Sequence, residues 1–124
     1  MSSDALLDED WIVPEWPAPA RVRSLITTRR GGVSVAPYAS FNLGAHVGDD
    51  PLAVAANRRQ LSRQLPSSPY WLNQVHGTAV VDAGASQLRL PTADGALART
   101  GATVCAVMTA DCLPVLLCDE TASV

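Results

Sequence analysis

The chain has 124 residues with a formal net charge of −3, and 48% of its residues are hydrophobic. This length is enough for one domain with its own core. The acidic balance argues against a nucleic-acid-binding protein, and no apolar stretch reaches the roughly 18 residues of a membrane-spanning helix.

The N-terminus points to the cellular compartment. Residues 1–10 are acidic and are predicted to form a flexible tail, without the basic start and apolar middle of a signal peptide. A cytoplasmic location is therefore expected. The three cysteines, Cys105, Cys112 and Cys118, are an odd number in a short span. This pattern indicates reduced thiols rather than a disulfide framework.

The first part of the body is predicted to be extended. Residues 11–19 are punctuated by proline, with Trp11 and Trp16 as expected anchors. Residues 22–28 are rich in β-branched side chains, which favours a strand. Residues 29–34 then read as a turn, because two adjacent glycines permit positive φ and close backbone approach.

The clearest helix follows Asp50. This aspartate can cap the helix, and Pro51 suits the first helical position. Pro66 is expected to end it. One apolar stripe on the helix predicts its buried face and comprises Val54, Leu61 and Leu65.

Strands are predicted in the second half, at residues 70–72 and 78–81, around a polar interruption at 73–77. Residues 84–99 are expected to be mostly loop. Apolar runs at 103–110 and 115–118 predict buried strands around a bend at Pro114. The resulting class is α+β. Val124 resembles the start of another strand, so we expect the chain to be a fragment of its fold.

Cys112 is the first candidate for chemistry, beside Asp111. A buried structural cysteine, a nucleophile and a metal ligand are all open interpretations. The two functional roles need a thiolate, and a neighbouring carboxylate raises the pKa of a thiol. Cys105 and Cys118 are expected to be buried thiols of the flanking strands.

His76 is the second candidate, since it lies in the polar interruption of a strand-like run. A structural histidine is the competing interpretation. The chain has only two histidines, whereas catalytic zinc usually keeps three protein ligands and one open position. His76 and Cys112 supply two at most. No C-x-x-C, P-loop, G-x-S-x-G or deaminase signature is present.

Polar residues in loops give weaker candidates. Arg29 and the following Arg-Gly-Gly could form an anion-binding turn, since arginine offers a fork and glycine exposes N–H groups. An ordinary solvated turn is the alternative. Asn42, Asp94 and Asp111 lie among small residues, where each is commonly a turn-former.

Taken in order, these motifs resemble the YfiH-type family, also called the multicopper polyphenol oxidase or laccase-like family, or the purine nucleoside phosphorylase YfiH family. The resemblance covers about residues 11–124. The motifs that carry it are Thr-Thr-Arg with Gly-Gly-Val-Ser at 27–34, Phe-Asn-Leu-Gly with His-Val-Gly-Asp at 41–49, Asn57-Arg58, Gln-Val-His-Gly at 74–77, Ala93-Asp94, and Thr-Ala-Asp-Cys-Leu-Pro-Val at 109–115.

The resemblance implies a layered α/β sandwich like the catalytic domain of cytotoxic necrotizing factor, with residues 11–124 as the N-terminal portion of a single domain. It implies a metal site using His76, Cys112 and a second histidine expected beyond residue 124. Asp111 would then be a carboxylate beside the ligands or facing substrate, grouped with His76 and Cys112 as catalytic. Arg29, Asn42 and Asp94 are the substrate-binding candidates. That Arg29 holds the phosphate is our own hypothesis and does not come from the resemblance.

The implied activities are phosphorolysis of adenosine, inosine, guanosine and methylthioadenosine, and deamination of adenosine. The implied partners are a purine nucleoside and phosphate, with no nucleic acid and no membrane. Zinc is preferred over copper, because multicopper oxidation needs more histidines than two. The alternatives are a copper-dependent polyphenol oxidase, a cysteine hydrolase with Cys112 as nucleophile, and a non-catalytic truncated domain. The chain alone is expected to be inactive.

Overall fold

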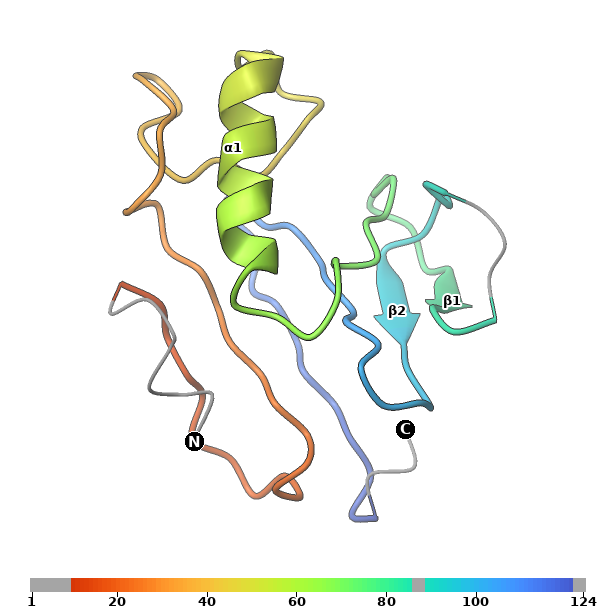
Figure 1. Ribbon diagram of the computed structural model, residues 1–124. Coiled ribbons are helices and arrows are strands. Elements are labelled where there is room, and N and C mark those ends of the chain that lie inside the picture. The colour runs from red at the N-terminus through yellow and green to blue at the C-terminus, as the bar shows by residue number, and fades with distance from the viewer. Residues whose placement is uncertain (1–9, 86–88, 122–124) are drawn as a thin grey trace. The chain divides into compact units, whose positions relative to one another are not determined.

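The computed structural model describes residues 10–85 and 89–121. These residues contain helix α1 (Pro51–Ser62) and strands β1 (Val80–Asp82) and β2 (Gly95–Leu97) (Figure 1). The α+β class is thus observed as a small mixed fold, while the layered sandwich stays a prediction. No helix in the described ranges is long and apolar enough to cross a membrane.

The chain divides into two compact units. The first, called the helical unit here, comprises Met1–Pro17 and Arg23–Gln64, and the second, called the strand unit, comprises Ala18–Val22 and Leu65–Val124. Each unit is described by itself. The single domain expected for 11–124 stays a prediction, and most of the expected tail at 1–10 lies outside the described residues.

Helix α1 begins where the sequence predicted. The Asp50 carboxylate accepts a hydrogen bond from the Leu52 N–H at 2.9 Å, and Pro51 occupies the first turn, where a missing N–H costs nothing. The helix ends at Ser62, earlier than the predicted stop before Pro66. The Gln64 N–H bonds to the carbonyl of Leu61 at 3.0 Å. This i to i−3 bond tightens the chain into a turn.

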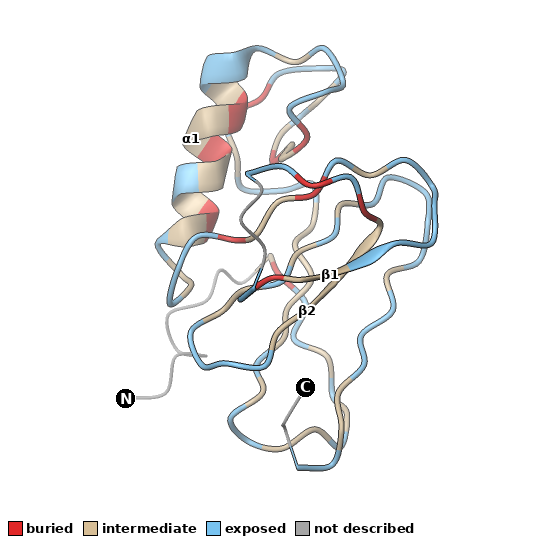
Figure 2. Ribbon diagram, turned by 90° about the vertical axis from the view of Figure 1, so that its right-hand side faces the viewer, coloured by how far each residue is buried: buried red, intermediate tan, exposed pale blue. Residues whose placement is uncertain are grey.

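The buried positions of α1 lie on one side of the helix (Figure 2). Val54 and Leu61 are buried as predicted, whereas Leu65 lies past the helix and is only half-buried. The helical unit also buries Trp11 against Phe41, with ring centroids 5.8 Å apart. The expectation that Trp11 anchors the extended segment is confirmed.

Asn57 is the polar centre of this core, with 0% of its surface exposed. Its amide nitrogen donates to the Asn42 carbonyl at 2.8 Å and the Ser34 hydroxyl at 2.9 Å, and lies 3.3 Å from the Ser40 carbonyl. Its oxygen accepts from the Val33 N–H at 2.9 Å. A buried amide with partners for both of its atoms joins α1 to the 33–42 loop at little desolvation cost.

Gly32 lies against this centre with no room for a side chain. A Cβ at this position would lie 2.6 Å from the Asn57 Oδ1 and 2.6 Å from the Phe41 Cα, and closer still to the Ser40 carbonyl oxygen. Gly31 before it has φ +95°, a conformation that favours glycine. The two glycines predicted to allow close backbone approach therefore do so.

The strand unit contains β1 and β2 (Figure 1). The two strands pair in parallel, with Val80 opposite Gly95 and Asp82 opposite Leu97. Strand β2 falls inside the range predicted as loop. Tyr70, predicted to begin a strand, forms only an isolated parallel bridge to Cys105. Buried residues of the unit include Leu72, Ala83 and Ala93.

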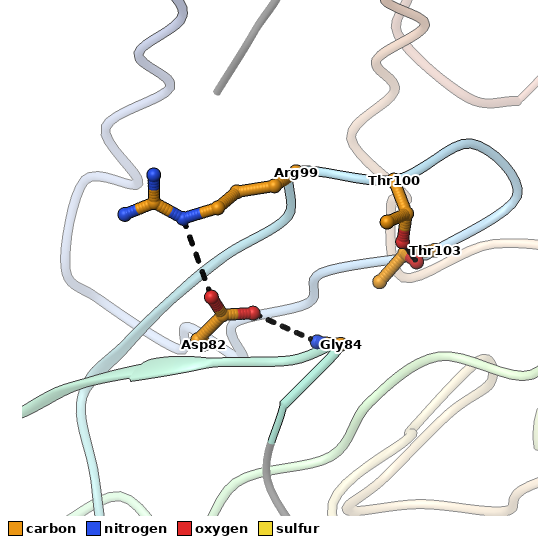
Figure 3. A network of polar contacts seen from close by, with 5 residues as sticks. All are labelled: Asp82, Gly84, Arg99, Thr100 and Thr103. Atoms are coloured by element: carbon orange, nitrogen blue, oxygen red, sulfur yellow. Dashed lines mark hydrogen bonds and ion pairs between the residues drawn. The ribbon is translucent and has the colours of Figure 1, made fainter.

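Asp82, the last residue of β1, makes polar contacts with the residues that follow the two strands. The Asp82 carboxylate accepts the Gly84 N–H at 3.0 Å and lies 3.3 Å from the Arg99 Nε (Figure 3). The hydroxyls of Thr100 and Thr103 are 2.9 Å apart in the following turn. Because the Arg99 side chain is 61% exposed, solvent screens this ion pair and its stabilisation is small.

The predicted strand at 22–28 is wrong in the helical unit, where Ile26 makes one antiparallel bridge to Ile12. One pair of bonded residues is a β-bridge, whereas a strand needs several consecutive pairs. The strand needs further partners along its length, and the described residues supply none.

The buried strands predicted at 103–110 and 115–118 are also wrong. Val107 in the first run is 38% exposed, and Val115 and Leu117 in the second are 74% and 86% exposed. The described chain shows no backbone hydrogen bond for residues 111–118. An apolar run becomes a buried strand only where a neighbouring strand and an apolar layer meet it, and the described part of the strand unit offers neither.

The cysteines share this exposure. Cys105 and Cys112 are exposed, and Cys118 is half-buried. The expectation of buried thiols at Cys105 and Cys118 is therefore wrong. All three are free.

We expect the Asn57→Ala variant to lose about 3 kcal/mol or more of unfolding free energy, because several buried polar groups lose their partner. Urea unfolding followed by tryptophan fluorescence measures this loss. Gln60→Ala is the matched control on the same helix, since its side chain makes one exposed hydrogen bond, to the Gly31 carbonyl. The control should cost about 0.5 kcal/mol. Equal losses in the two variants would contradict a central role for Asn57.

Gly32→Ala is expected to lower the unfolding free energy by about 2 kcal/mol, because the methyl group overlaps backbone atoms of the Ser40–Phe41 segment. Gly101→Ala is the control, since no heavy atom lies within 4 Å of its built Cβ. Thermal unfolding of both variants tests the difference. A Gly32→Ala variant as stable as Gly101→Ala would show that the loop shifts freely.

Candidate functional site

His76 has an unusual backbone in the strand unit. Its φ is +62°, a left-handed conformation that costs roughly 1 kcal/mol or more for a residue with a Cβ. The side chain is exposed. Something must hold this conformation, because a histidine on a free loop would relax to negative φ.

Asp94, next to β2, stabilises this backbone conformation. Its Oδ1 accepts the N–H groups of Gly77 at 2.8 Å and Val75 at 3.1 Å, and its Oδ2 accepts the His76 N–H at 2.8 Å. The Gly77 bond is the main cause that lowers the pKa of Asp94 below its ordinary value, with further lowering from the Val75 and His76 bonds against opposing desolvation. Both carboxylate oxygens are thus engaged by backbone.

Gln74 attaches the same loop to the segment that leads to Cys112. Its amide nitrogen donates to the Met108 carbonyl at 2.9 Å, and its amide oxygen accepts the Met108 N–H at 2.7 Å. A side-chain amide that pairs with both backbone groups of one residue fixes position and orientation together. Met108 precedes Cys112 by four residues, so the His76 loop is fixed to the cysteine's own segment.

Asp111 and Cys112 are both exposed. No hydrogen bond of either residue is present within the described ranges. Hydrogen bonds therefore bring Gln74, His76 and Asp94 together with their neighbouring backbone, whereas Asp111 and Cys112 lie at the exposed end of the segment that Gln74 contacts.

Imidazole and thiolate are the donor types that zinc prefers. Among residues 10–85 and 89–121, however, no group of three or more His, Cys, Asp or Glu side chains is placed to hold a metal ion. The donor chemistry of His76 and Cys112 therefore fits zinc, and their number falls one short of the usual three protein ligands.

The helical unit carries an open depression at its surface, called the Arg29–Arg30 cavity here. It is open, about 430 Å³ in volume, and lined by Arg29, Arg30, Gly31, Ala39 and Ser40. Both arginines are exposed. The Arg29 carbonyl accepts the Ser40 N–H at 2.7 Å and the Ser40 hydroxyl at 3.0 Å, so the two walls of the cavity are joined. Two guanidinium groups at such a cavity suit an anion.

The Asn42 amide is used within its own loop. Its oxygen accepts the Gly44 N–H at 3.0 Å, and its nitrogen donates to the Asp49 carboxylate at 3.1 Å. The Ser34 hydroxyl donates to the same carboxylate at 2.6 Å and is the main cause that lowers the pKa of Asp49. These contacts match a loop-forming asparagine.

Sequence reasoning did not single out Gln74 or Ser40 as site residues, whereas Arg30 belongs to the turn that was considered for anion binding. A glutamine within an otherwise strand-like run was the available signal for Gln74, because such a side chain needs a partner. Nothing in the sequence pairs Ser40 with the Arg29 turn, since the two meet only through the fold.

A family model described as multi-copper polyphenol oxidoreductase laccase matches residues 23–124. The chain therefore belongs to this family, as its motifs predicted. It is 55% identical over 111 residues to a purine nucleoside phosphorylase of Pseudomonas aeruginosa, covering 90% of this chain and 45% of that protein. It is 51% identical to the purine nucleoside phosphorylase YfiH of Escherichia coli, covering 88% of this chain and 46% of the relative.

The fold has a solved counterpart. A Neisseria meningitidis protein of the DUF152 family superposes with a TM-score of 0.86 at 50% identity, over 93% of this chain and 48% of that one. YlmD of Geobacillus stearothermophilus superposes with a TM-score of 0.62 at 28% identity, over 84% of this chain and 39% of that one. The chain spans about half the length of the relatives it matches.

Proposed function

We propose that this chain contributes to an enzyme that cleaves purine nucleosides with phosphate. The observation that carries the proposal is its 55% identity to a protein named purine nucleoside phosphorylase. Phosphorolysis transfers the ribosyl group from the purine nitrogen to a phosphate oxygen. The protein must therefore hold an anion and stabilise the departing base, which is mainly a matter of positioning and charge.

Arg29 and Arg30 are proposed to hold the phosphate. They line the open cavity of the helical unit together with Ser40. Arginine presents paired N–H donors that match two phosphate oxygens, and its charge does not depend on pH in the neutral range. The Ser40 hydroxyl already accepts the Gly32 N–H at 3.2 Å, which orients it at the cavity wall.

His76 and Cys112 are proposed to supply two ligands of a zinc site, with a further ligand from elsewhere. Zinc would supply Lewis-acid polarisation or an activated water, and the water would extend the activity to deamination of adenosine. Cys112 serves as a ligand in this proposal and not as a nucleophile, since one thiolate cannot do both at once. Copper-dependent oxidation is disfavoured, because the chain has two histidines.

Inorganic phosphate is expected to bind the Arg29–Arg30 cavity and to shift the amide resonances of Gly31 and Ser40. Replacing both arginines with glutamine should weaken this binding about tenfold or more, because charge-assisted hydrogen bonds are lost. NMR titration with phosphate measures the change. The control is Arg59→Gln, an exposed arginine of α1 in the same unit. Unchanged affinity in the double variant would refute the assignment.

The reaction class is tested with inosine and adenosine. Any release of hypoxanthine or adenine by this chain should require inorganic phosphate and yield ribose 1-phosphate, while ammonia from adenosine would report deamination. With two zinc ligands of three, the chain alone should react far more slowly than its Pseudomonas aeruginosa relative. Base release that is independent of phosphate, or a rate equal to the relative's, would contradict the proposal. Chromatography of the products makes the measurement.

A further inference from the structure

We propose that Asp94 and Gln74 are positioning residues for His76, and that Asp94 acts on the backbone of the loop and not on substrate. The proposal rests on the proposed function only in taking His76 as a functional side chain. It replaces the expected substrate-binding role of Asp94 with one in which both of its oxygens are already used.

The first argument is that the strained backbone of His76 coincides with the hydrogen bonds that stabilise it. His76 has φ +62°, and a carboxylate accepts the N–H groups of His76 and of both its neighbours within 3.1 Å. Three successive N–H groups converge on one anion only when the backbone turns in this way. The charge-assisted bonds therefore select the left-handed conformation, which sets the direction in which the imidazole leaves the backbone.

The second argument is the register of the loop. Asp94 fixes the shape of residues 75–77, but it does not fix their distance from the segment that carries Cys112. Gln74 does this, because its amide pairs with both backbone groups of Met108 at 2.9 Å and 2.7 Å. Shape and register are thus set by two different side chains.

The third argument is sequence adjacency. Asp94 directly precedes β2, and its own N–H donates to the Ala79 carbonyl, next to β1, at 3.0 Å. The carboxylate is therefore tied to the paired strands. The described chain has no second group that accepts the three loop N–H bonds. A neutral side chain at position 94 cannot replace the arrangement, because an asparagine amide nitrogen would face one of the donors.

The test uses the metal-free full chain. In Asp94→Asn, the hydrogen exchange of the His76 amide should accelerate about tenfold or more, and the Cα shift of His76 should move away from its left-handed value. Asp82→Asn is the matched control. Its carboxylate lies in the same unit and also accepts a backbone N–H, that of Gly84. Unchanged His76 signals in Asp94→Asn, or equal changes in Asp82→Asn, would overturn the proposal.

If the Asp94→Asn variant unfolds, the same substitution is tested in a chain that already carries His76→Gly. Glycine adopts positive φ without strain, so His76→Gly should reduce the stability cost of Asp94→Asn and restore folding. An undiminished cost, or continued unfolding, would overturn the role of Asp94. Gln74→Ala should accelerate exchange of the Met108 amide by a similar factor, because it removes the acceptor of that N–H, while Asn73→Ala should not. Failure of this contrast would remove Gln74 from the proposal.

Zinc affinity separates this inference from the proposed function. Chelator competition with zinc alone should show about tenfold weaker binding in Asp94→Asn and no change in Asp82→Asn, as for other residues that orient a ligand. Zinc binding that survives His76→Gly unchanged would refute His76 as a ligand. The exchange data would then still decide whether Asp94 holds the loop.

Discussion

The buried amide of Asn57 is the interaction on which the helical unit depends. Hydrophobic contact alone would not orient α1, since Val54 and Leu61 give only a narrow stripe on a short helix. The amide adds direction, because its hydrogen bonds end on the backbone and hydroxyl of the 33–42 loop. The turn at Arg29 is closed over the same loop through Ser40. The proposed phosphate site is thus connected to a helix through one polar residue.

In the strand unit, a surface carboxylate gives the 75–77 loop a defined conformation. Asp94 fixes the backbone of the His76 loop by hydrogen bonds in place of side-chain packing, because this exposed loop has no core of its own. Gln74 repeats the device on a second segment. In both units, a polar side chain with all its groups engaged gives the loop its shape. The apolar residues around it mainly exclude water.

The sequence was informative where the determinants are local. Asp50 and Pro51 announce the start of α1, because capping depends on three or four neighbouring residues. The end of the helix and strand β2 were missed, since both depend on contacts beyond a short window. His76 was marked by its polar surroundings, yet its positive φ follows from Asp94, eighteen residues away. The run at 103–118 has a strand pattern, but in the described chain it pairs only through the isolated Tyr70–Cys105 bridge and the Gln74 side chain, so it is not buried as a strand.

Leu113, Val115 and Leu117 alternate along a segment whose backbone groups are unpaired in the described chain. Unpaired backbone groups of this kind can pair with another strand only where each residue has an N–H to donate, and Pro114 in the middle of the segment has none.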